Sequence, residues 1–430
     1  MNPQVHQAVT SESHTPSNRP EDLSPLLVIG SGDPVMRGYC LRRAAHHHPV
    51  LLIDSHPPTW QRAYIVDHET VDLRDPLAVM TAADSLAERW NITGVVTWDE
   101  YHLLTTARIA ERLGLPGNSP YAVLAARDKA LSRLRCSVSG VPSPRASWVT
   151  SPETAANAAE QIGYPVVLKP TAHAGSVGVT RVDSAQDLDR GWKAASAGVA
   201  SQGPEGHGVM VEEYLDGPEV SVETVTDNGE TTVVAVTRKR LGFAPFFLET
   251  GHTVVADDPL LETAAPVAQQ ALEALGITHG VSHVELRLTD RGPHLIEVNA
   301  RQAGDLIGEL VLHATGVDLA RAAADLACGL TPDVKPTRRA AAAIEMFYPA
   351  HEGTLTSHRL PPGTSDTAME RLQWLRKVGD DVTLTPSSAH PNNTRLGFAI
   401  VTGRTAAETQ RAVDDINRRI KFAIRPAMPN

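Results

Sequence analysis

Short apolar runs alternate with amphipathic segments from Leu26 to Leu113, and this alternation limits the possible folds more than any other feature of the chain. The runs LLVIG (26 to 30) and VLLID (50 to 54) predict buried strands, because they are apolar and border turn or acidic residues. Strands that alternate with helices favour a doubly wound α/β domain, here expected to end near Pro120. The other elements expected in this domain are helices over 36–45, 76–90 and 102–113 and a strand over 94–98.

Two patterns in this region suggest ligand sites that the residues do not support. Gly30, Gly32 and Asp54 resemble part of a dinucleotide-binding fingerprint, but Val35 stands where the third glycine is required. The triplet 46–48 suggests a metal site, yet adjacent histidines at the end of a helix cannot all face one ion. We therefore favour structural roles for both patterns.

Composition excludes several classes of partner. The chain has 430 residues with 42% hydrophobic and 21% charged side chains, which is typical of a soluble enzyme of several domains. Its 50 acidic and 39 basic residues give a net charge of −11, so we expect neither nucleic-acid nor membrane partners. Three cysteines without a CxxC pair suggest no disulfide framework, and we expect a cytoplasmic protein. Residues 1–24 lack the apolar core of a signal peptide and are expected to form a disordered leader.

The segment 163–182 combines a short strand, one lysine and a glycine-containing loop. Lys169 follows the apolar run 166–168 directly, and Gly175 and Gly178 supply positions where backbone N–H groups can approach anionic oxygens. This is not a Walker A loop, because no GK[ST] sequence follows the glycines. The segment predicts a phosphate-binding loop, although a hairpin with a surface lysine would show the same pattern.

A second pattern lies between 209 and 223, where a strand, a turn and another strand carry acidic residues. The first strand ends in Glu212 and Glu213, and the second begins with Glu219 after a turn at 216–218. Main-chain groups near Glu212 and Leu215 suit an adenine edge, and Glu219 suits ribose hydroxyls. The other interpretation is an acidic hairpin edge that protects a sheet.

The segment 283–301 is expected to form a hairpin with one polar face. Strand periodicity places His283, Glu285 and Arg287 opposite three apolar residues, Val284, Leu286 and Leu288. On the partner strand the same periodicity directs two apolar residues into the core and three polar residues to the other face. The core residues are Ile296 and Val298, and the polar residues are Glu297, Asn299 and Arg301.

Two carboxylates and an amide oxygen would therefore converge on this hairpin. Hard oxygen ligands of this kind suit Mg²⁺, which usually takes one or two carboxylates and completes its shell with phosphates and water. A face of salt bridges that involve Arg287 and Arg301 is the other interpretation.

These segments, together with Lys129 on a helix that begins near 121, occur in the order and approximate spacing found in the ATP-grasp enzymes. The resemblance covers about residues 25 to 430 and implies an α/β (α+β) fold in which two lobes hold ATP between them. It implies an N-terminal α/β domain over 25–120, a linker helix and small lobe over 121–215, a large lobe over 216–334 and a C-terminal domain over 335–430. Residues 392–408 resemble part of that closing domain.

The resemblance also implies roles for single residues. It assigns Glu285, Glu297 and Asn299 to two Mg²⁺ ions, for which Mn²⁺ is expected to substitute. The residues assigned to ATP are Lys129, Lys169, His173, Gly175, Ser176, Gly178, Glu212, Glu213, Leu215 and Glu219.

Within this superfamily the chain most resembles the L-amino acid ligases, which are dipeptide synthetases. The segment FFLETGHTV (246 to 254) is similar to an element beside their substrate site, so Glu249 and His252 are expected to position substrates and Arg301 to steady an acyl phosphate. A tryptophan that limits the pocket in a dipeptide synthetase is replaced here by Asp305, so a very small second substrate is not implied. Asp305 is expected to face a cationic substrate group or to pair with Arg301.

The resemblance implies an ADP-forming ligase that activates a carboxylate as an acyl phosphate and joins it to an amine. Its partners would be small-molecule carboxylates and amines, and a homodimer is implied by resemblance alone. Activation of bicarbonate, as in biotin carboxylases, and nucleotide binding without turnover are the alternatives. The basic run 238–240 is interpreted as a solvated surface or a charged lid.

Overall fold

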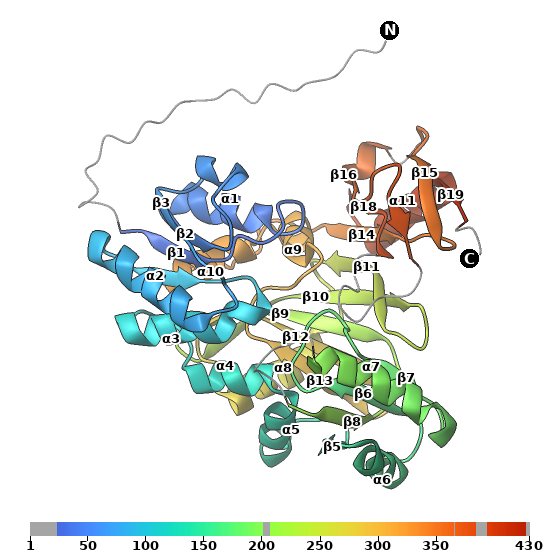
Figure 1. Ribbon diagram of the computed structural model, residues 1–430. Coiled ribbons are helices and arrows are strands. Elements are labelled where there is room, and N and C mark those ends of the chain that lie inside the picture. The colour runs from blue at the N-terminus through green and yellow to red at the C-terminus, as the bar shows by residue number, and fades with distance from the viewer. Residues whose placement is uncertain (1–23, 201–206, 365, 384–393, 427–430) are drawn as a thin grey trace.

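The computed structural model describes residues 24–200, 207–364, 366–383 and 394–426. The expected leader lies outside the described residues except for Ser24, and so do Asn392 and Asn393 of the expected closing domain. No helix among the described residues is long and apolar enough to cross a membrane. The elements form an N-terminal domain, a small lobe and a large sheet that continues into the C-terminal region (Figure 1).

The N-terminal domain has a parallel sheet with helices on both faces, as predicted. Its strands lie in the order β3-β2-β1-β4. Period two separates the faces, since Leu27 and Ile29 of β1 pack with the helices of one face while Leu26 and Val28 pack with those of the other. The elements are β1 (Leu26–Ile29), α1 (Gly38–His47), β2 (Val50–Asp54), β3 (Asp67–Thr70), α2 (Pro76–Arg89), β4 (Gly94–Val96) and α3 (Leu103–Leu113).

Two helices, α4 (Pro120–Arg127) and α5 (Lys129–Val138), replace the single helix expected around Lys129. The chain breaks at Asp128, which has extended backbone angles and accepts hydrogen bonds from the N–H groups of Ala130 and Leu131. This capping begins a new helix, so Lys129 is the first residue of α5.

The small lobe contains a four-stranded antiparallel sheet in the order β5-β8-β6-β7. Its helices α6 and α7 pack against the sheet. The core between them includes Val166 and Leu168 of the predicted strand. The elements are β5 (Ala146–Val149), α6 (Pro152–Ile162), β6 (Val166–Pro170), β7 (Thr180–Val182), α7 (Leu188–Ala200) and β8 (Val209–Glu213).

The large lobe is built on a sheet of eight strands in the order β13-β12-β9-β10-β11-β14-β18-β16. Helix α8 packs on one part of this sheet and α9 and α10 pack on another. The elements before residue 335 are β9 (Glu219–Asp227), β10 (Glu230–Gly242), β11 (Leu248–Val255), α8 (Leu261–Leu275), β12 (Gly280–Thr289), β13 (Gly292–Asn299), α9 (Ile307–Thr315) and α10 (Leu319–Ala327).

The C-terminal region extends the same sheet, because β14 pairs with β11 and β18 pairs with β14. A further three-stranded sheet has the order β17-β15-β19. The boundaries expected between domains stay predictions. The elements of this region are β14 (Ala341–Phe347), β15 (Gly353–Arg359), β16 (Met369–Trp374), β17 (Asp381–Val382), β18 (Gly397–Gly403), α11 (Ala406–Arg419) and β19 (Lys421–Arg425).

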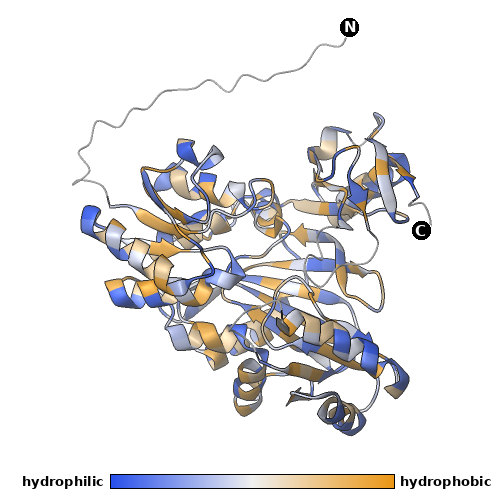
Figure 2. Ribbon diagram, viewed as in Figure 1, coloured by the Kyte–Doolittle hydropathy of each residue, from blue (hydrophilic) through white to orange (hydrophobic). Residues whose placement is uncertain are grey.

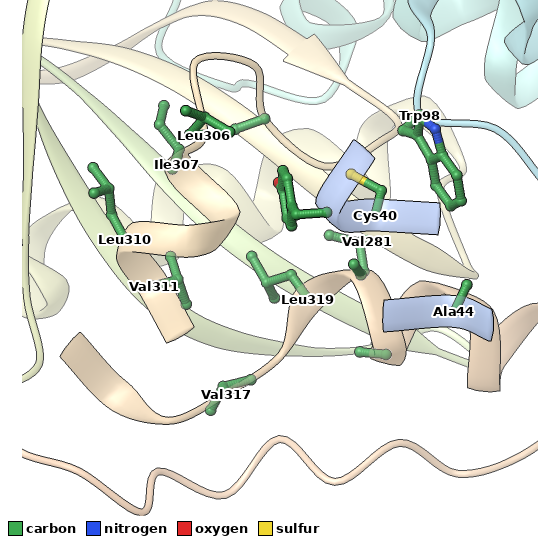
Figure 3. Close-up of a cluster of buried hydrophobic side chains, with 14 of the residues drawn as sticks. Cys40, Ala44, Trp98, Val281, Leu306, Ile307, Leu310, Val311, Val317 and Leu319 are labelled. Carbon is green, nitrogen blue, oxygen red and sulfur yellow. The ribbon is translucent and has the colours of Figure 1, made fainter. Parts of the chain in front are cut away.

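One hydrophobic cluster joins the N-terminal domain to the large lobe. Figure 3 shows Cys40 and Ala44 of α1 in the same cluster as Leu310 of α9 and Leu319 of α10. In Figure 2 the helices around the sheets carry both hydrophobic and hydrophilic positions, as expected for elements with one face in a core. Because this shared core fixes α1 on the large lobe, residues beside α1 can contribute to a site in that lobe.

Candidate active site

A cavity of about 470 Å³ lies between the small lobe and the large sheet, and the N-terminal domain contributes part of its wall. Residues from β6, β8 and the glycine loop line it together with residues from β11, β12 and β13. Of the predicted site residues, Gly178 and His252 do not line this cavity. Those that do are Lys129, Lys169, His173, Gly175, Ser176, Glu212, Glu213, Leu215, Glu219, Glu249, Glu285, Glu297, Asn299 and Arg301.

The two predicted phosphate lysines are both buried and both paired. Lys129 Nζ lies 3.0 Å from Glu297 Oε1 and also donates to the His173 carbonyl at 3.0 Å. Lys169 Nζ lies 2.7 Å from Glu212 Oε2. Burial lowers the pKa of Lys169 from its usual value, and Glu212 opposes this shift. The surface lysine considered as the alternative for Lys169 is therefore wrong, and Lys129 is buried as well.

Glu212 carries a second buried partner that the sequence did not indicate. Arg133 of α5 lies 3.0 Å from the Glu212 carboxylate. Burial alone would raise the pKa of Glu212, but Arg133 and Lys169 outweigh burial and lower it. The carboxylate is thus ionised and fixed by two cations, which leaves its main chain as the part that can meet an adenine.

The glycine loop, which joins β6 to β7 in the small lobe, contacts the large lobe. Gly175 and Gly178 have φ values of 69° and 72°, where L side chains are strained. A Cβ on Gly178 would lie 2.9 Å from the Ala194 carbonyl oxygen, so this glycine permits close packing on α7 rather than lining the cavity. Ser176 Oγ donates to the Phe247 carbonyl of the large lobe at 3.0 Å.

Between the two lobes the chain turns at Asp216 to Pro218, as predicted. Gly217 has φ 137°, and a Cβ there would lie 2.1 Å from the Leu288 carbonyl oxygen. After the turn, Glu219 accepts a hydrogen bond from Arg287 Nε at 3.0 Å. Burial raises the pKa of Glu219, and Lys239 opposes this shift.

The polar face that the sequence predicts as a metal site is formed on the hairpin of β12 and β13. Glu285 is opposite Glu297 in the register, and His283 is opposite Asn299. The prediction for Ile296 is wrong, because the register shifts between Glu285 and Leu286. This bulge directs Leu295 into the core and places Ile296 on the cavity wall.

Lys239 of β10 is a residue of this face that sequence reasoning missed. Its side chain is 1% exposed, and Nζ lies 2.5 Å from Glu285, 2.6 Å from Glu249 and 3.5 Å from Glu219. Interpreting 238–240 as a solvated run is therefore wrong for Lys239. Arg238 and Arg240 pair with Asp258 and Glu345. Strand alternation was the available signal, since it separates Lys239 from the arginines on either side.

Lys239 and His283 control the ionisation of Glu285. Burial would raise the pKa of Glu285, but these two cations lower it well below its usual value. His283 Nδ1 also lies 2.9 Å from Glu223 Oε2. Burial lowers the pKa of His283, yet Glu223 outweighs burial and raises it to about 9. Glu285 is thus ionised and able to bind a cation.

The oxygen atoms of this face fit a divalent metal. Single carboxylate oxygens of Glu219, Glu249 and Glu285 lie within 4.8 Å of one another, and Glu297 and Asn299 add oxygens from β13. Such a donor set, free of sulfur, suits Mg²⁺. Among the described residues, the triplet 46–48 belongs to no such group; His48 instead contacts Asp325 at 2.8 Å.

Of the two alternatives for Asp305, the pairing with Arg301 is wrong. Arg301 Nε lies 2.8 Å from Glu100 of the N-terminal domain, whereas both Asp305 oxygens lie 2.7 Å from Arg395. Burial would raise the pKa of Asp305, but Arg395 and His252 lower it well below its usual value. Arg395 comes from the C-terminal region and was missed, because no pattern in the sequence connects it with Asp305.

His252 lies behind this wall rather than on it. Its side chain is 0% exposed, and Nε2 lies 3.2 Å from Asp305 and 3.8 Å from Glu249. The ring therefore contacts two carboxylates that line the cavity, not the cavity itself.

Asp54 of the dinucleotide pattern near β1 is hydrogen-bonded within the protein. Asp54 Oδ2 accepts hydrogen bonds from the backbone N–H of Ser31 at 3.1 Å and from its hydroxyl at 2.5 Å. The carboxylate thus closes the turn after β1, in agreement with the structural role favoured from the sequence.

Known protein families match both parts of this architecture. Residues 162–309 match the ATP-grasp domain and residues 48–117 match the ATP-grasp N-terminal domain. Carnosine synthase 1 of Homo sapiens is 31% identical over 300 residues, which are 66% of this chain and 35% of that enzyme. Alanine–anticapsin ligase of Bacillus subtilis is 29% identical over 267 residues, which are 56% of this chain and 55% of that enzyme. The chain thus spans about a third to about half of the length of these two ligases.

A solved structure shows the same fold along nearly the whole chain. The L-amino acid ligase of Bacillus licheniformis superposes with a TM-score of 0.78, covering 94% of this chain and 100% of that one at 21% identity. The fold agrees with the two family matches. The chain belongs to the ATP-grasp superfamily of ligases and resembles the L-amino acid ligases within it.

Proposed function

We propose that this protein is an ADP-forming ligase that activates the carboxylate of an amino acid as an acyl phosphate and joins it to an amine. The observation that carries the proposal is the contact between Lys129 and Glu297 at 3.0 Å. Lys129 is predicted to bind phosphate and Glu297 to bind a metal ion, and both line one cavity. A γ-phosphoryl group and its metal ion would have to bind side by side in such a cavity. The similarity to alanine–anticapsin ligase and carnosine synthase 1 supports the amide-forming outcome.

The chemistry requires activation because a carboxylate oxygen is a poor leaving group. Transfer of the γ-phosphoryl group from ATP to the carboxylate forms an acyl phosphate and ADP; the amine then displaces phosphate and forms the amide. Lys129 and Lys169 would contact the phosphates, and Arg301 would steady the acyl phosphate. Glu285, Glu297 and Asn299 would hold two Mg²⁺ ions, which stabilise negative charge on phosphate oxygens.

The acceptor amine must be neutral when it attacks. Glu249 and Asp305 line the cavity and offer carboxylates to an arriving ammonium group, while His252 contacts both from behind. We therefore assign His252 to positioning these carboxylates. Substitution of His252 by Ala should alter the pH profile of amide formation without removing nucleotide binding.

A matrix of phosphate-release assays tests the function directly. Purified protein with ATP and Mg²⁺ is given single amino acids, pairs of amino acids, or bicarbonate. Release that depends on a carboxylate and an amine, together with an amide product identified by mass spectrometry, is the expected result. Release with bicarbonate alone would instead favour a carboxylase-like activity, and absence of release under every condition would contradict the proposal.

The metal assignment has its own test. We expect the Glu297→Gln variant to lose ADP formation while its circular dichroism spectrum stays that of the wild type, because the amide keeps the size but not the charge. Glu88→Gln, in α2 of the N-terminal domain, is the matched control and should retain activity. Substantial turnover by folded Glu297→Gln protein would remove Glu297 from the metal site.

A further inference from the structure

Arg37 is a cation on the cavity wall for which the described part of the chain provides no carboxylate partner. It precedes α1 in the N-terminal domain and lines the cavity, where its Nη1 atom donates to the Ala303 carbonyl at 2.7 Å. Among the described residues, no carboxylate lies within ion-pair distance of its guanidinium. Arg37 thus brings to the cavity a positive charge that no carboxylate of the described residues neutralises.

The other arginines and lysines that line the cavity differ from Arg37 in this respect. Each of them lies within ion-pair distance of a carboxylate in the described part of the chain. The pairs are Lys129 with Glu297, Lys169 with Glu212, Arg287 with Glu219, Arg301 with Glu100, and Arg395 with Asp305. An anionic group that enters the cavity therefore finds Arg37 available without displacing a protein carboxylate.

The contact with Ala303 places Arg37 at the substrate end of the cavity. Ala303 lies in the loop after β13, two residues beyond Arg301 and two before Asp305. A Cβ on Gly304 in the same loop would lie 3.8 Å from Arg37 Nη2. The guanidinium of Arg37 thus contacts the loop that carries Asp305, and both residues line the cavity.

Helix α1 adds to the positive potential at this position. The helix begins at Gly38, directly after Arg37, and no side chain caps its first turn. The positive end of a helix dipole attracts anions, so it acts in the same sense as the guanidinium.

We propose that Arg37 binds the free carboxylate of the acceptor and thereby selects amino acids over simple amines. This inference rests on the proposed ligase function. The donor carboxylate is converted into an acyl phosphate and then into an amide, so it does not keep the negative charge of a carboxylate. The acceptor carboxylate keeps its charge from binding to product, so a cation without a protein partner matches it. The acceptor ammonium would face Glu249 and Asp305, the carboxylates on the same wall.

The test compares each active acceptor amino acid with its carboxamide, which keeps the amine and side chain but lacks the carboxylate. For the wild type, we expect a KM roughly 10- to 100-fold lower for the amino acid, as for the loss of a charge-assisted hydrogen bond. Arg37→Met should raise the KM for the amino acid by a similar factor and leave the KM values for the carboxamide and for ATP unchanged. Arg37→Lys, which keeps the charge but not the fork of donors, should fall between the two.

Arg42→Met is the matched control, because it removes an arginine from the exposed face of the same helix, away from the cavity. Equal KM values of the wild type for amino acid and carboxamide would overturn the inference, and so would an Arg37→Met effect confined to ATP or the donor. If the wild type releases no phosphate with any pair, the ligase proposal fails. Titration calorimetry of L-alanine and L-alaninamide then decides the role of Arg37, since equal affinities would contradict it.

Discussion

Lys239 offers the sharpest test of how the metal face is held together. The Lys239→Met variant keeps the length of the side chain but removes a cation that is 1% exposed and contacts three carboxylates. Burial lowers the pKa of Lys239, but Glu249 and Glu285 outweigh burial and raise it, so the ammonium is charged in the native protein. Its loss leaves Glu219, Glu249 and Glu285 without their shared counter-charge.

The size of the effect follows from the burial of this cluster. Removal of one partner from a buried ion pair costs about 3–5 kcal/mol of stability, because a charge is left buried without compensation. In the Lys239→Met variant, His283 and Arg287 still pair with Glu285 and Glu219. Although three glutamates lose this partner, they can take up protons, so we expect the loss of stability to stay within this range. Mg²⁺ should recover part of it, since an ion at 100 times its Kd stabilises the state that binds it by about 2.7 kcal/mol.

The assay is urea unfolding followed by circular dichroism, in EDTA and in saturating Mg²⁺. We expect Lys239→Met to unfold at a lower urea concentration than the wild type in EDTA, and the gap between the two proteins to narrow in Mg²⁺. The control is Lys193→Met, which removes an exposed lysine paired with Asp189 at 2.6 Å and should leave both midpoints unchanged. An unchanged midpoint for Lys239→Met in EDTA would refute the counter-charge role, and midpoints that Mg²⁺ leaves unchanged in both proteins would refute a metal at these carboxylates.

Two further predictions concern Glu100 and Gly217. Glu100→Gln removes the charge of the carboxylate that pairs with the buried Arg127 and Arg301, and it should lower the free energy of unfolding by about 3–5 kcal/mol at pH 7. Burial would raise the pKa of Glu100, but Arg301 and Arg127 lower it; its contribution is therefore present above the unfolded pKa of about 4.3 and lost as the pH falls through the folded pKa. In urea unfolding over a pH series, the free energies of unfolding of wild type and variant should thus converge as the pH falls. A difference that stays constant with pH would contradict the predicted direction of the pKa shift. Gly217→Ala should lower both the melting temperature and the affinity for ATP, because its Cβ meets the Leu288 carbonyl; Gly229→Ala, with a positive φ but open space around it, separates this clash from backbone strain.

Local patterns predicted the elements that depend on residues close in sequence. The alternation from Leu26 onwards identified the parallel sheet, because each face of β1 is apolar and both faces are covered by helices. The hairpin of Glu285 and Glu297 was also predictable, since strand period two needs only neighbouring residues. The same rule failed at Ile296, because Leu295 and Ile296 are both apolar and their pattern does not reveal a bulge.

Contacts between distant segments were the part that the sequence did not reveal. Lys239 resembles a surface lysine because its glutamates come from three other strands, β9, β11 and β12. Arg395 reaches Asp305 across 90 residues, and Arg133 reaches Glu212 across 79. Such pairs depend on tertiary packing, whereas sequence patterns report only periodicity and spacing.

The pairing of Lys129 with Glu297 and of Lys169 with Glu212 has a consequence for the order in which ligands are recognised. A phosphate that arrives alone must compete with a carboxylate for each lysine, and a metal ion that arrives alone must compete with a lysine for Glu297. When both arrive as one complex, the metal satisfies the carboxylate while the phosphate satisfies the ammonium group. The cavity is therefore expected to bind the magnesium complex of the nucleotide more tightly than either the nucleotide or the metal ion alone.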